Sequence, residues 1–574
     1  MKILAQRTGE IMTEQLRQWG VNHIYGLPGD SINEFIDDIR NKDDLDFIQV
    51  RHEETGALAA SSEAKLTGNL GVCLSIAGPG GIHLLNGLYD AKGDHAPVLA
   101  IVGQVASTSL GTDAFQEINL ERMFDDVAVF NKRAESHEQL PDMLNQAIRT
   151  AYAEKGVSVL IVPDDLFAEK QKEGETLTTP GYFRPNIFPA QEDMNKARDL
   201  IEQAEKPLIL AGKGASGAQE ELISFAEKAG APIIVSLLAK GLIPDNHPYC
   251  LGHHGQIGTK PSYYAMKETD LLILIGTQFP YAEFFPKDVP GFQIDNKPEN
   301  IGKYYPVTAG LAGDAKATLA SLISTMNKTE DYSYLEKQQE RMNNWRVALQ
   351  KEKREEKTPI QGPQVMYQIE QLMEPGAVVS TDVGNVTVWA ARFLSFLDQK
   401  FLISGQLATM GIGLPGAIAS QIVYPDKQVI AICGDGGFSM SMHDFVTAVK
   451  YQLPIKVIIL NNEKIGMIKY EQQQMGHISS ETDLGPVNFA GFAENCGGDG
   501  YRIESFDEME TKMKQAFMSD KPTIIDVCIE DMAPLPGHID YTAATNYSQY
   551  IIKNFFETGT MDLPDMKKAA RRMF

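Results

Sequence analysis

The sequence predicts an α/β protein of three doubly wound domains, each built on a parallel β-sheet, with an amphipathic helical tail at the C-terminus. Its 574 residues are enough for three to four domains of ordinary size. Short apolar runs rich in Val and Ile alternate with segments that can form helices, which is the pattern of parallel strands joined by crossover helices. The alternation is interrupted between residues 175 and 190 and again at 328–358, and these interruptions divide the chain into three domains.

We expect an N-terminal domain over residues 1–175, a central domain over 190–327 and a third domain over 359–531. A Pro-, Thr- and Gly-rich linker separates the first two domains, and a charged connector at 328–358 precedes the third. The tail covers residues 532–574. The connector predicts a solvated helix, because it carries apolar residues at roughly helical spacing, namely Leu335, Met342, Trp345 and Leu349.

Composition excludes several classes of function. The 52 basic and 76 acidic residues give a net charge of −24, which argues against binding to nucleic acid. The five cysteines are scattered without a CxxC pair, so we expect free thiols in a reducing cytoplasm. No signal-peptide core and no apolar run of membrane-spanning length is present in the sequence. These features predict a cytoplasmic protein, at most peripheral to a membrane.

The stretch from residue 429 to 462 carries the strongest chemical signal. Two apolar runs, 429–433 and 455–460, predict buried parallel strands, and 442–451 predicts the crossover helix between them. The first strand leads into Gly434-Asp435-Gly436-Gly437 and the second into Asn461-Asn462. Both clusters therefore lie at the carboxyl edge of the sheet, where open α/β sheets bind ligands. Glycines allow close approach of a phosphate, and carboxylate and amide oxygens suit Mg²⁺.

A GDG tripeptide alone predicts only a turn, but here a helix, an apolar strand and two asparagines follow it. The combination resembles the thiamin-diphosphate-binding motif of thiamin-dependent enzymes. The resemblance implies a bound thiamin diphosphate, with Gly436 and Gly437 at the cofactor. It also implies three ligands of Mg²⁺, namely Asp435, the side chain of Asn462 and the carbonyl of Lys464.

Glu53 follows a predicted strand at 47–50, at the start of a helix of small residues. Taken alone, it is an acidic residue in the first turn of a helix, where the dipole favours it. The segment Arg51-His52-Glu53-Glu54 resembles the catalytic-glutamate segment of the pyruvate oxidase and acetolactate synthase superfamily. There the carboxylate hydrogen-bonds a ring nitrogen of the cofactor's aminopyrimidine. Because the glutamate and the Mg²⁺ site come from different subunits in that family, the resemblance implies at least a homodimer, and typically a tetramer.

Two further loops resemble active-site segments of this superfamily. Phe115 alone reads as a packing anchor, but the matching Phe-Gln-Glu of pyruvate oxidases implies that Phe115 and Gln116 lie over the reacting centre, with His83 as a weaker candidate. Met410 alone reads as a core residue. In the family, the residue here bends the cofactor, and its neighbours Ala408 and Thr409 are then cofactor contacts as well.

The central domain carries glycine-rich loops at the ends of several predicted strands. Gly212 to Gly217 matches GxGxxG, which alone is a weak indication of dinucleotide binding. Several such loops in one domain fit a long ligand with more than one phosphate. They resemble the FAD domain of pyruvate oxidases and imply FAD contacts at Gly212, Gly214, Gly252, His253, His254, Gly255, Gly276, Thr277, Gln278, Phe279, Pro280, Asp295 and Asp314.

The helix after Asn462 distinguishes the branches of the superfamily. Acetolactate synthases have a Trp here that selects the second 2-oxo acid, whereas this chain has Glu471, as pyruvate oxidases do. Glu471 is therefore a catalytic candidate, and Ile468 and Met467 are cofactor contacts. Met467 stands where pyruvate oxidases usually carry an aromatic residue, so an aromatic role in electron transfer does not carry over to it.

The tail predicts two amphipathic helical faces. Tyr547, Ile551 and Phe555 form the first, with Asn546 as a cap and Gly559 as a stop. The second is formed by Leu563, Met566, Ala570, Met573 and Phe574, beside the basic residues Lys567, Lys568, Arg571 and Arg572. A basic amphipathic helix suits an anionic lipid surface, although packing on its own or a neighbouring subunit is an alternative. The tail is similar to that of the quinone-dependent branch of the family.

Together these motifs resemble the thiamin-diphosphate- and FAD-dependent pyruvate oxidase family over the whole chain, closest to the bacterial pyruvate:quinone oxidoreductases (quinone-dependent pyruvate dehydrogenases). The resemblance implies oxidation of pyruvate to acetate and carbon dioxide, with electrons passing through FAD to a membrane quinone at the inner face of the cell membrane. The N-terminal domain would bind the pyrimidine and the third domain the diphosphate. The alternatives are a phosphate- and oxygen-dependent pyruvate oxidase that makes acetyl phosphate, an acetolactate-synthase-type carboligase, and a non-enzymatic cofactor-binding or membrane-associated protein.

Overall fold

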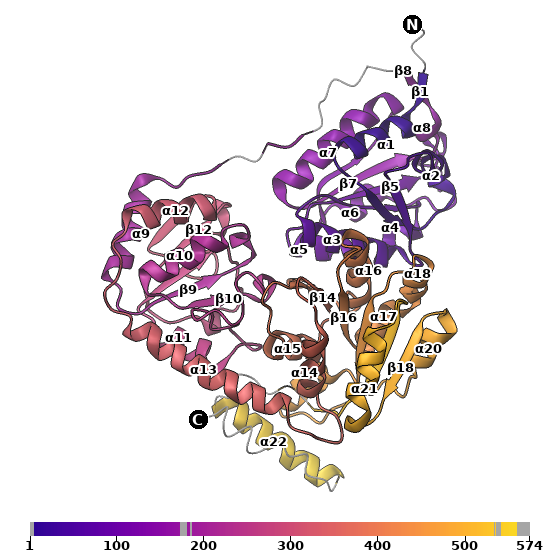
Figure 1. The fold of residues 1–574 in the computed structure, drawn as a ribbon. Coiled ribbons are helices and arrows are strands. Elements are labelled where there is room, and N and C mark those ends of the chain that lie inside the picture. The colour runs from indigo at the N-terminus through magenta and orange to yellow at the C-terminus, as the bar shows by residue number, and fades with distance from the viewer. Residues whose placement is uncertain (1–4, 173–180, 184–185, 533, 535–540, 559–574) are drawn as a thin grey trace.

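The computed structural model describes residues 5–172, 181–183, 186–532, 534 and 541–558, and shows three α/β domains in the order that the sequence predicts (Figure 1). The N-terminal and C-terminal domains pack side by side, and the central domain lies beside them, joined through the long helix α13. All pairings within the three larger sheets are parallel, and β1 and β8 form a separate antiparallel pair.

The N-terminal sheet has the strand order β3-β2-β4-β5-β7-β6. Its middle strands β4, β5 and β7 are buried along their whole length, as expected for apolar strands covered on both faces. Helices α1, α2 and α7 cover one face, and α3, α5 and α6 cover the other. The elements are β1 (Ala5–Arg7), α1 (Thr8–Gln18), β2 (His23–Gly26), α2 (Asn33–Arg40), β3 (Asp46–Gln49), α3 (Glu53–Thr67), β4 (Gly71–Ser75), α4 (Pro79–His83), α5 (Leu85–Gly93), β5 (Val98–Gln104), α6 (Leu120–Phe124), β6 (Ala128–Arg133), α7 (Leu140–Glu154), β7 (Val157–Pro163), α8 (Asp165–Ala168) and β8 (Lys170–Lys172).

The central sheet has the order β10-β9-β11-β12-β13, so the chain reverses direction across the sheet between β9 and β11. Such a switch point opens a crevice at the carboxyl ends of the strands. The predicted strands that lead into Gly212 and Gly276 are confirmed as Pro207–Ala211 and Leu271–Ile275. The elements are α9 (Gln191–Gln203), β9 (Pro207–Ala211), α10 (Gln219–Ala229), β10 (Ile233–Val235), α11 (Lys260–Glu268), β11 (Leu271–Ile275), β12 (Gly291–Asp295), β13 (Ala309–Ala312) and α12 (Ala315–Thr325).

The C-terminal sheet has the order β15-β14-β16-β17-β19-β18, which repeats the topology of the N-terminal domain strand for strand. Its switch point lies between β14 and β16. The elements are α14 (Gly362–Leu372), β14 (Val378–Thr381), α15 (Asn385–Phe393), β15 (Lys400–Leu402), α16 (Gly413–Val423), β16 (Val429–Gly434), α17 (Asp435–Ser441), α18 (Phe445–Lys450), β17 (Lys456–Asn461), α19 (Gly466–Gln474), α20 (Phe489–Cys496), β18 (Asp499–Ile503), α21 (Phe506–Phe517) and β19 (Thr523–Cys528).

The connector forms helix α13 (Ser333–Lys353), but it is not simply solvated. Trp345, Met342 and Leu349 are buried in the cluster that joins the central and C-terminal domains. The predicted apolar spacing is therefore a packing face, which sequence alone could not assign to a partner.

The N-terminal and C-terminal domains are joined by α3 and α16, which pack against each other. Beside them, the buried Lys65 ammonium lies 2.6 Å from Asp90 Oδ2 and 2.5 Å from Asp94 Oδ2, and donates to the Ile403 carbonyl at 3.1 Å. Asp94 in turn accepts hydrogen bonds from the backbone N–H of Gly405 at 3.0 Å. A buried cluster of one ammonium and two carboxylates thus spans the domain contact, and the ion pairs offset part of the cost of burying these charges.

The described part of the tail is helix α22 (Tyr541–Thr558), which packs on α19. Tyr550 is buried there and its hydroxyl accepts from Gln473 Nε2 at 3.0 Å. Asn546 lies inside the helix, so the prediction that it caps the helix is wrong. Phe556 is 82% exposed. Gly559 and the second apolar and basic face fall outside the described residues, and none of the described helices is both long and apolar enough to cross a membrane.

Candidate active site

Asp435 stands at the carboxyl end of β16, at the switch point of the C-terminal sheet. Helix α17 begins at Asp435 itself, so the crossover starts seven residues earlier than the predicted helix at Met442. The carboxylate accepts from the N–H of Gly436 at 3.0 Å and of Lys464 at 3.2 Å. Burial raises its pKa to about 6, although these backbone N–H groups lower it. Asp435 is thus fixed in orientation and 5% exposed.

Three oxygen atoms converge at the metal-ligand candidates, one each from Asp435, Asn462 and Lys464. The side-chain oxygen of Asn462 lies 3.3 Å from Asp435 Oδ1 and 3.1 Å from the carbonyl oxygen of Lys464. Turning the amide over would replace these contacts by two hydrogen bonds. Adjacent ligands in an octahedral Mg²⁺ shell, with bonds of about 2.1 Å, are separated by about 3 Å. The predicted ligands Asp435, Asn462 and Lys464 therefore fit Mg²⁺ in donor type and spacing.

Asp382, which follows β14 across the switch point, is a site residue that the sequence reasoning did not single out. Its buried carboxylate accepts from Val383 N–H at 2.7 Å, Gly411 N–H at 2.9 Å and Gly413 N–H at 3.2 Å. Burial raises the pKa of Asp382 to about 6, although the hydrogen bonds from these N–H groups and from the Cys433 thiol lower it. A Cβ at Gly437 would lie 2.7 Å from the Asp382 carboxylate, so that position needs glycine. The signal that marked Asp435, a polar residue ending a buried strand at the sheet edge, also marks Asp382.

Asp382 therefore holds the loop that carries the predicted contacts Ala408, Thr409 and Met410. Ala408 has a φ of +56°, which is unusual for a residue with a side chain. The Met410 methyl lies 3.3 Å from where a Cβ at Gly436 would be, so its side chain covers the GDGG turn. Thr409 Oγ1 accepts from Asn86 Nδ2 of the N-terminal domain at 2.9 Å. The loop is thus placed between the candidate Mg²⁺ ligands and the N-terminal domain.

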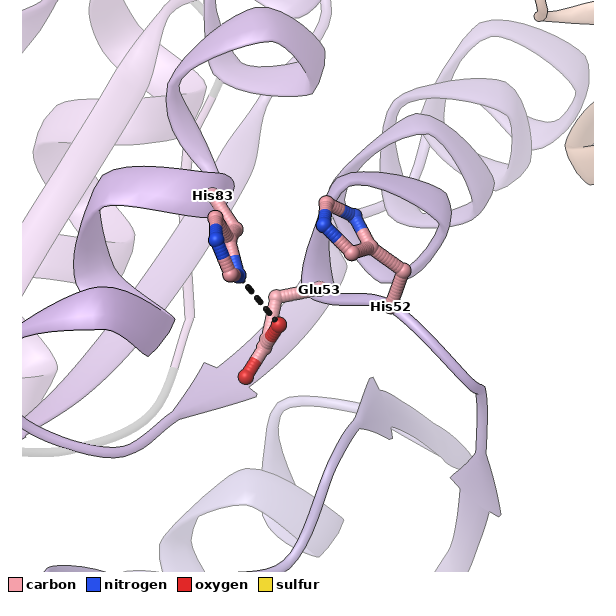
Figure 2. A group of neighbouring side chains, drawn as sticks. All are labelled: His52, Glu53 and His83. Carbon is pink, nitrogen blue, oxygen red and sulfur yellow. Dashed lines mark hydrogen bonds and ion pairs between the residues drawn. The ribbon is translucent and has the colours of Figure 1, made fainter. Parts of the chain in front are cut away.

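Glu53 is the first residue of α3 and is 5% exposed (Figure 2). Its Oε2 lies 2.9 Å from Nδ1 of His83, the last residue of α4. The ring of His52 stacks on His83 with centroids 4.3 Å apart, and its Nδ1 accepts from Glu54 N–H at 3.3 Å to cap α3. The pKa of His52 is lowered, mainly by burial and secondly by the charge of neighbouring His83. One carboxylate oxygen is thus fixed by His83, and Oε1 faces Gly80 in the first turn of α4.

Among the described residues, His52, Glu53 and His83 are the one group of three potential metal-binding side chains with ligand atoms within 4.8 Å of one another. Two imidazoles and one carboxylate are a poor set for Mg²⁺, which prefers oxygen. The oxygen cluster at Asp435 is the better Mg²⁺ site.

Gln116 lies against the start of the helix that carries His83, and Phe115 directly precedes it in the chain. Gln116 has a φ of +66°, and a Cβ at Gly78 would come within 2.8 Å of its carbonyl oxygen. The start of α4, at residues 78–80, therefore lies between Gln116 and Glu53. Phe115 is 85% exposed, so within one chain it is not a packing anchor.

Helix α19 follows the metal-ligand segment directly and carries the other predicted residues. Met467 is half-buried, whereas Ile468 and Glu471 are exposed on one helical face, three residues apart. The opposite side of α19 carries Gln473 against Tyr550 of the tail. Glu471 therefore lies on an exposed face of the helix that begins two residues after Lys464.

The glycine loops of the central domain meet at its switch point. Gly212 follows β9 and Gly276 follows β11, and the loops pack so closely that a Cβ at Gly212 would lie 2.3 Å from the Gly276 carbonyl oxygen. Gly214 contacts the same loop. These glycines are thus required for packing as well as for any ligand. Asp295 ends β12 at the same edge and accepts from Lys297 N–H at 2.9 Å, whereas Asp314 caps α12 through Ala317 N–H at 2.9 Å.

His253 and His254 differ in what they offer to a ligand. His254 is bonded at both ring nitrogens, at 3.3 Å to Ser262 Oγ and 2.9 Å to the Phe284 carbonyl. His253 Nδ1 lies 3.0 Å from the Val235 carbonyl, and its buried Nε2 has no hydrogen-bond partner among the described residues. Burial lowers the pKa of His253 to about 4. Such an orphaned polar atom fits a bound group.

The remaining predicted residues of the central domain surround this crevice. Gly252 and Gly255 both have positive φ angles and flank the two histidines. Thr277 is buried, Gln278 Nε2 lies 3.4 Å from His95 of the N-terminal domain, and Pro280 is partly exposed. The ring of Phe279 lies 5.9 Å from that of His254. The crevice thus has an aromatic wall and borders the N-terminal domain.

Three family models match the chain in sequence. They are the N-terminal thiamine pyrophosphate-binding domain over residues 6–123, the central domain of thiamine pyrophosphate enzymes over 194–322, and the C-terminal thiamine pyrophosphate-binding domain over 382–527. The matches fall on the three domains of the structure, and together they include both switch points at which Asp435 and Gly276 lie.

Several relatives resemble the chain along most of its length. "Putative thiamine pyrophosphate-containing protein YdaP" of Bacillus subtilis is 53% identical over 574 residues, 100% of both chains. "Pyruvate oxidase" of Lactiplantibacillus plantarum is 34% identical over 92% of this chain and 89% of its own. "Probable acetolactate synthase large subunit" of Methanocaldococcus jannaschii is 33% identical over 92% of both chains. With the cofactor motif and the three matching domains, these relatives show that the chain belongs to the thiamine pyrophosphate-dependent enzymes, in the family of pyruvate oxidases and acetolactate synthases.

Proposed function

We propose that the protein is a pyruvate:quinone oxidoreductase, which oxidises pyruvate and water to acetate and carbon dioxide and passes the two electrons through FAD to a membrane quinone. The observation that carries the thiamin part is the geometry at Asp435, where three oxygens converge at the spacing of Mg²⁺ ligands. The carboxylate in Glu471, in place of the tryptophan of carboligases, supports an oxidase.

The Mg²⁺ ion would be held by Asp435, Asn462 and Lys464, with the diphosphate beside Gly436 and Gly437. Thiamin diphosphate supplies, when bound, a carbon nucleophile and an electron sink for decarboxylation. Asp382 fixes the loop on which Met410 supports the cofactor from one side. These residues would bind and orient the cofactor.

Glu53 holds and moves the proton that the reaction requires. His83 occupies Oε2, which leaves Oε1 free to hydrogen-bond the aminopyrimidine and hold a proton there. Burial of Glu53 excludes water and strengthens that hydrogen bond. Gln116 borders the start of α4, and together with Phe115 it would cover the substrate. Glu471 would face the substrate from α19.

FAD is proposed for the crevice of the central domain. The fit rests on the orphaned Nε2 of His253, the glycine loops around Gly212 and Gly276, and the carboxylate of Asp295 at the neighbouring strand end. When bound, FAD supplies a two-electron acceptor. Thr277 and Phe279 would line the crevice on the side toward the C-terminal domain.

The assembly and location are part of the proposal. A homodimer is the minimum unit, with a tetramer as the expected form, in the cytoplasm. The tail's basic residues support peripheral attachment to an anionic lipid surface at the inner face of the membrane, where the quinone is dissolved.

A second candidate is a phosphate- and oxygen-dependent oxidase that makes acetyl phosphate, supported by the similarity to "Pyruvate oxidase". A third is a carboligase, supported by the similarity to acetolactate synthases. Phosphate dependence and peroxide formation identify the second, and a carbon–carbon-bonded product identifies the third.

The decisive variant is Glu53→Gln, which keeps the shape and removes the ionisable group. We expect turnover of pyruvate to fall at least about 100-fold, because general acid–base groups contribute this much. The control is Glu54→Gln, whose amide oxygen can still accept from Asn86 Nδ2, at 2.6 Å in the structure. Near-normal turnover in the Glu53 variant would overturn the assignment.

A further inference from the structure

Strand β3, which leads into the Glu53 turn, is an edge strand of the N-terminal sheet. Toward its partner β2 it donates from Asp46 to the Asn22 carbonyl at 2.8 Å, and Val50 just after it donates to the Gly26 carbonyl at 3.0 Å. Because backbone groups alternate along a strand, residues 47, 49 and 51 point their polar groups away from the sheet. Such an open edge needs partners.

The C-terminal domain supplies those partners. The Tyr451 hydroxyl accepts from Gln49 N–H at 2.8 Å and donates to the Phe47 carbonyl at 3.3 Å, as a neighbouring strand would. The next outward donor, Arg51 N–H, is bonded to Asp444 Oδ1 at 2.7 Å. Two side chains of another domain therefore continue the sheet along the edge and end it two residues before Glu53.

Asp444 is itself rigidly held. It is fully buried, and Oδ1 also accepts from Thr447 Oγ1 at 2.7 Å. His443 Nε2 lies 3.2 Å from Oδ2, and the His443 ring meets the His52 ring edge-on at 5.6 Å. Burial raises the pKa of Asp444, but its hydrogen bonds to His443, Thr55, Thr447 and Arg51 outweigh that and keep it low. A charged acceptor at this place also suits the start of α3.

We propose that Asp444 is a positioning residue for Glu53, acting through the Arg51 backbone and through the His443–His52 contact. The proposal rests on the proposed function, in which Glu53 carries the proton. Asp444 does not touch substrate or cofactor in this account. It fixes where α3 begins, and therefore where the Glu53 carboxylate lies relative to His83.

This role follows because, among the described residues, Asp444 supplies the hydrogen-bond acceptor for the outward-facing Arg51 N–H at this turn. His83 fixes one oxygen of Glu53 but not the backbone that carries it. A shift of about 1 Å in a reacting group can cost about 100-fold in rate. The docked C-terminal domain would thus set the geometry of a glutamate in another domain.

The test measures amide exchange in the full-length protein and turnover in the holoenzyme. In Asp444→Ala, we expect the Arg51 amide to exchange at least about tenfold faster and kcat to fall about 10- to 100-fold, with the KM for pyruvate within about threefold. Asp444→Asn keeps Oδ1 as an acceptor, so both quantities should stay within about threefold of wild type. Tyr451→Phe should accelerate exchange at Gln49 and leave Arg51 protected.

The matched control is Lys450→Ala, which removes another contact between the same domains, from Lys450 Nζ to Gln49 Oε1 at 2.6 Å, without touching the turn. It should match wild type in exchange at Arg51 and in kcat. The proposal is overturned by normal exchange in Asp444→Ala, by faster exchange with unchanged kcat, or by an Asn variant as impaired as the Ala variant. If Asp444→Ala does not fold, Asp444→Glu replaces it and should show the same losses, because the longer side chain displaces the turn. Absence of pyruvate turnover in wild type would contradict the proposed function alone, because the exchange comparison does not depend on it.

Discussion

Asp382 offers the sharpest test of what holds the loop at residues 408–413, which carries the predicted cofactor contacts Ala408, Thr409 and Met410. Its carboxylate ties the end of β14 to the loop at residues 408–413 through Gly411 N–H and Gly413 N–H. In Asp382→Asn, the remaining oxygen can keep the bonds to Val383 and Gly411, whereas the amide nitrogen faces Gly413 N–H. In Asp382→Ala, all of these donors lose their acceptor.

The expected changes in the free energy of unfolding follow from the burial and the pKa of Asp382. Each buried donor left without a partner costs about 1–3 kcal/mol. Burial raises the Asp382 pKa from 3.8 to about 6, so ionisation favours the unfolded chain. That cost is absent below pH 3.8, grows as pH rises, and is fully present above pH 6, at about 3 kcal/mol. An uncharged amide avoids it, which offsets the lost bond to Gly413. We therefore expect Asp382→Asn to be about as stable as wild type at pH 8.

Asp382→Ala should be about 3 kcal/mol less stable than Asp382→Asn, because it loses two further hydrogen bonds. For a domain of this size that corresponds to a fall in Tm of about 9 °C. Differential scanning calorimetry at pH 5 and pH 8 measures both effects, and the Tm of the Asn variant should improve relative to wild type as pH rises. Equal Tm values for the Ala and Asn variants, or a relative loss for Asn at higher pH, would refute this reasoning.

Three further predictions follow from the same structure. The pKa of His253 in the folded protein is about 4, below its ordinary value of 6.5, so the unfolded chain takes up a proton first as pH falls. His253→Gln should therefore remove about 2 kcal/mol of destabilisation at pH 5. The Tm of the apoprotein should then fall less on acidification than that of wild type, and an equal fall would contradict this. Asp435→Ala should weaken Mg²⁺-dependent thiamin diphosphate binding at least about 100-fold in equilibrium titrations while the protein stays yellow with FAD, and retained Mg²⁺-dependent binding would exclude Asp435 as a ligand. Truncation after Thr558 leaves α22 on α19 and removes four basic residues; vesicles containing phosphatidylglycerol should bind less protein while turnover with a soluble dye is unchanged, and unchanged lipid binding would remove the tail's membrane role.

Strands and their ligand-bearing ends could be predicted because they depend on local pattern. The strands Val429–Gly434 and Lys456–Asn461 lie within one residue of their apolar runs, and Asp435 and Asn462 meet as expected for neighbouring parallel strands. The start of α17 was missed because Gly-Gly after Asp435 predicts a loop, whereas packing against Asp382 makes glycine necessary inside a helix.

Residues that act across the fold could not be found in the same way. Asp444 reads as an ordinary acidic residue of a crossover segment, and only the docking of β3 gives it Arg51 as a partner. Asn546 looks like a helix cap, but contact with α19 allows the helix to begin earlier, at Tyr541. In both cases long-range packing, which sequence spacing does not encode, overrides the local preference.

The measurement closest to the central claim is anaerobic addition of pyruvate to the purified protein with thiamin diphosphate and Mg²⁺, followed by flavin absorbance. We predict rapid bleaching, because electrons released on decarboxylation pass to FAD in the same protein. Glu53→Gln should stay yellow under the same conditions. A wild-type protein that contains FAD and releases carbon dioxide but remains yellow would contradict the account and indicate a carboligase or a simple decarboxylase.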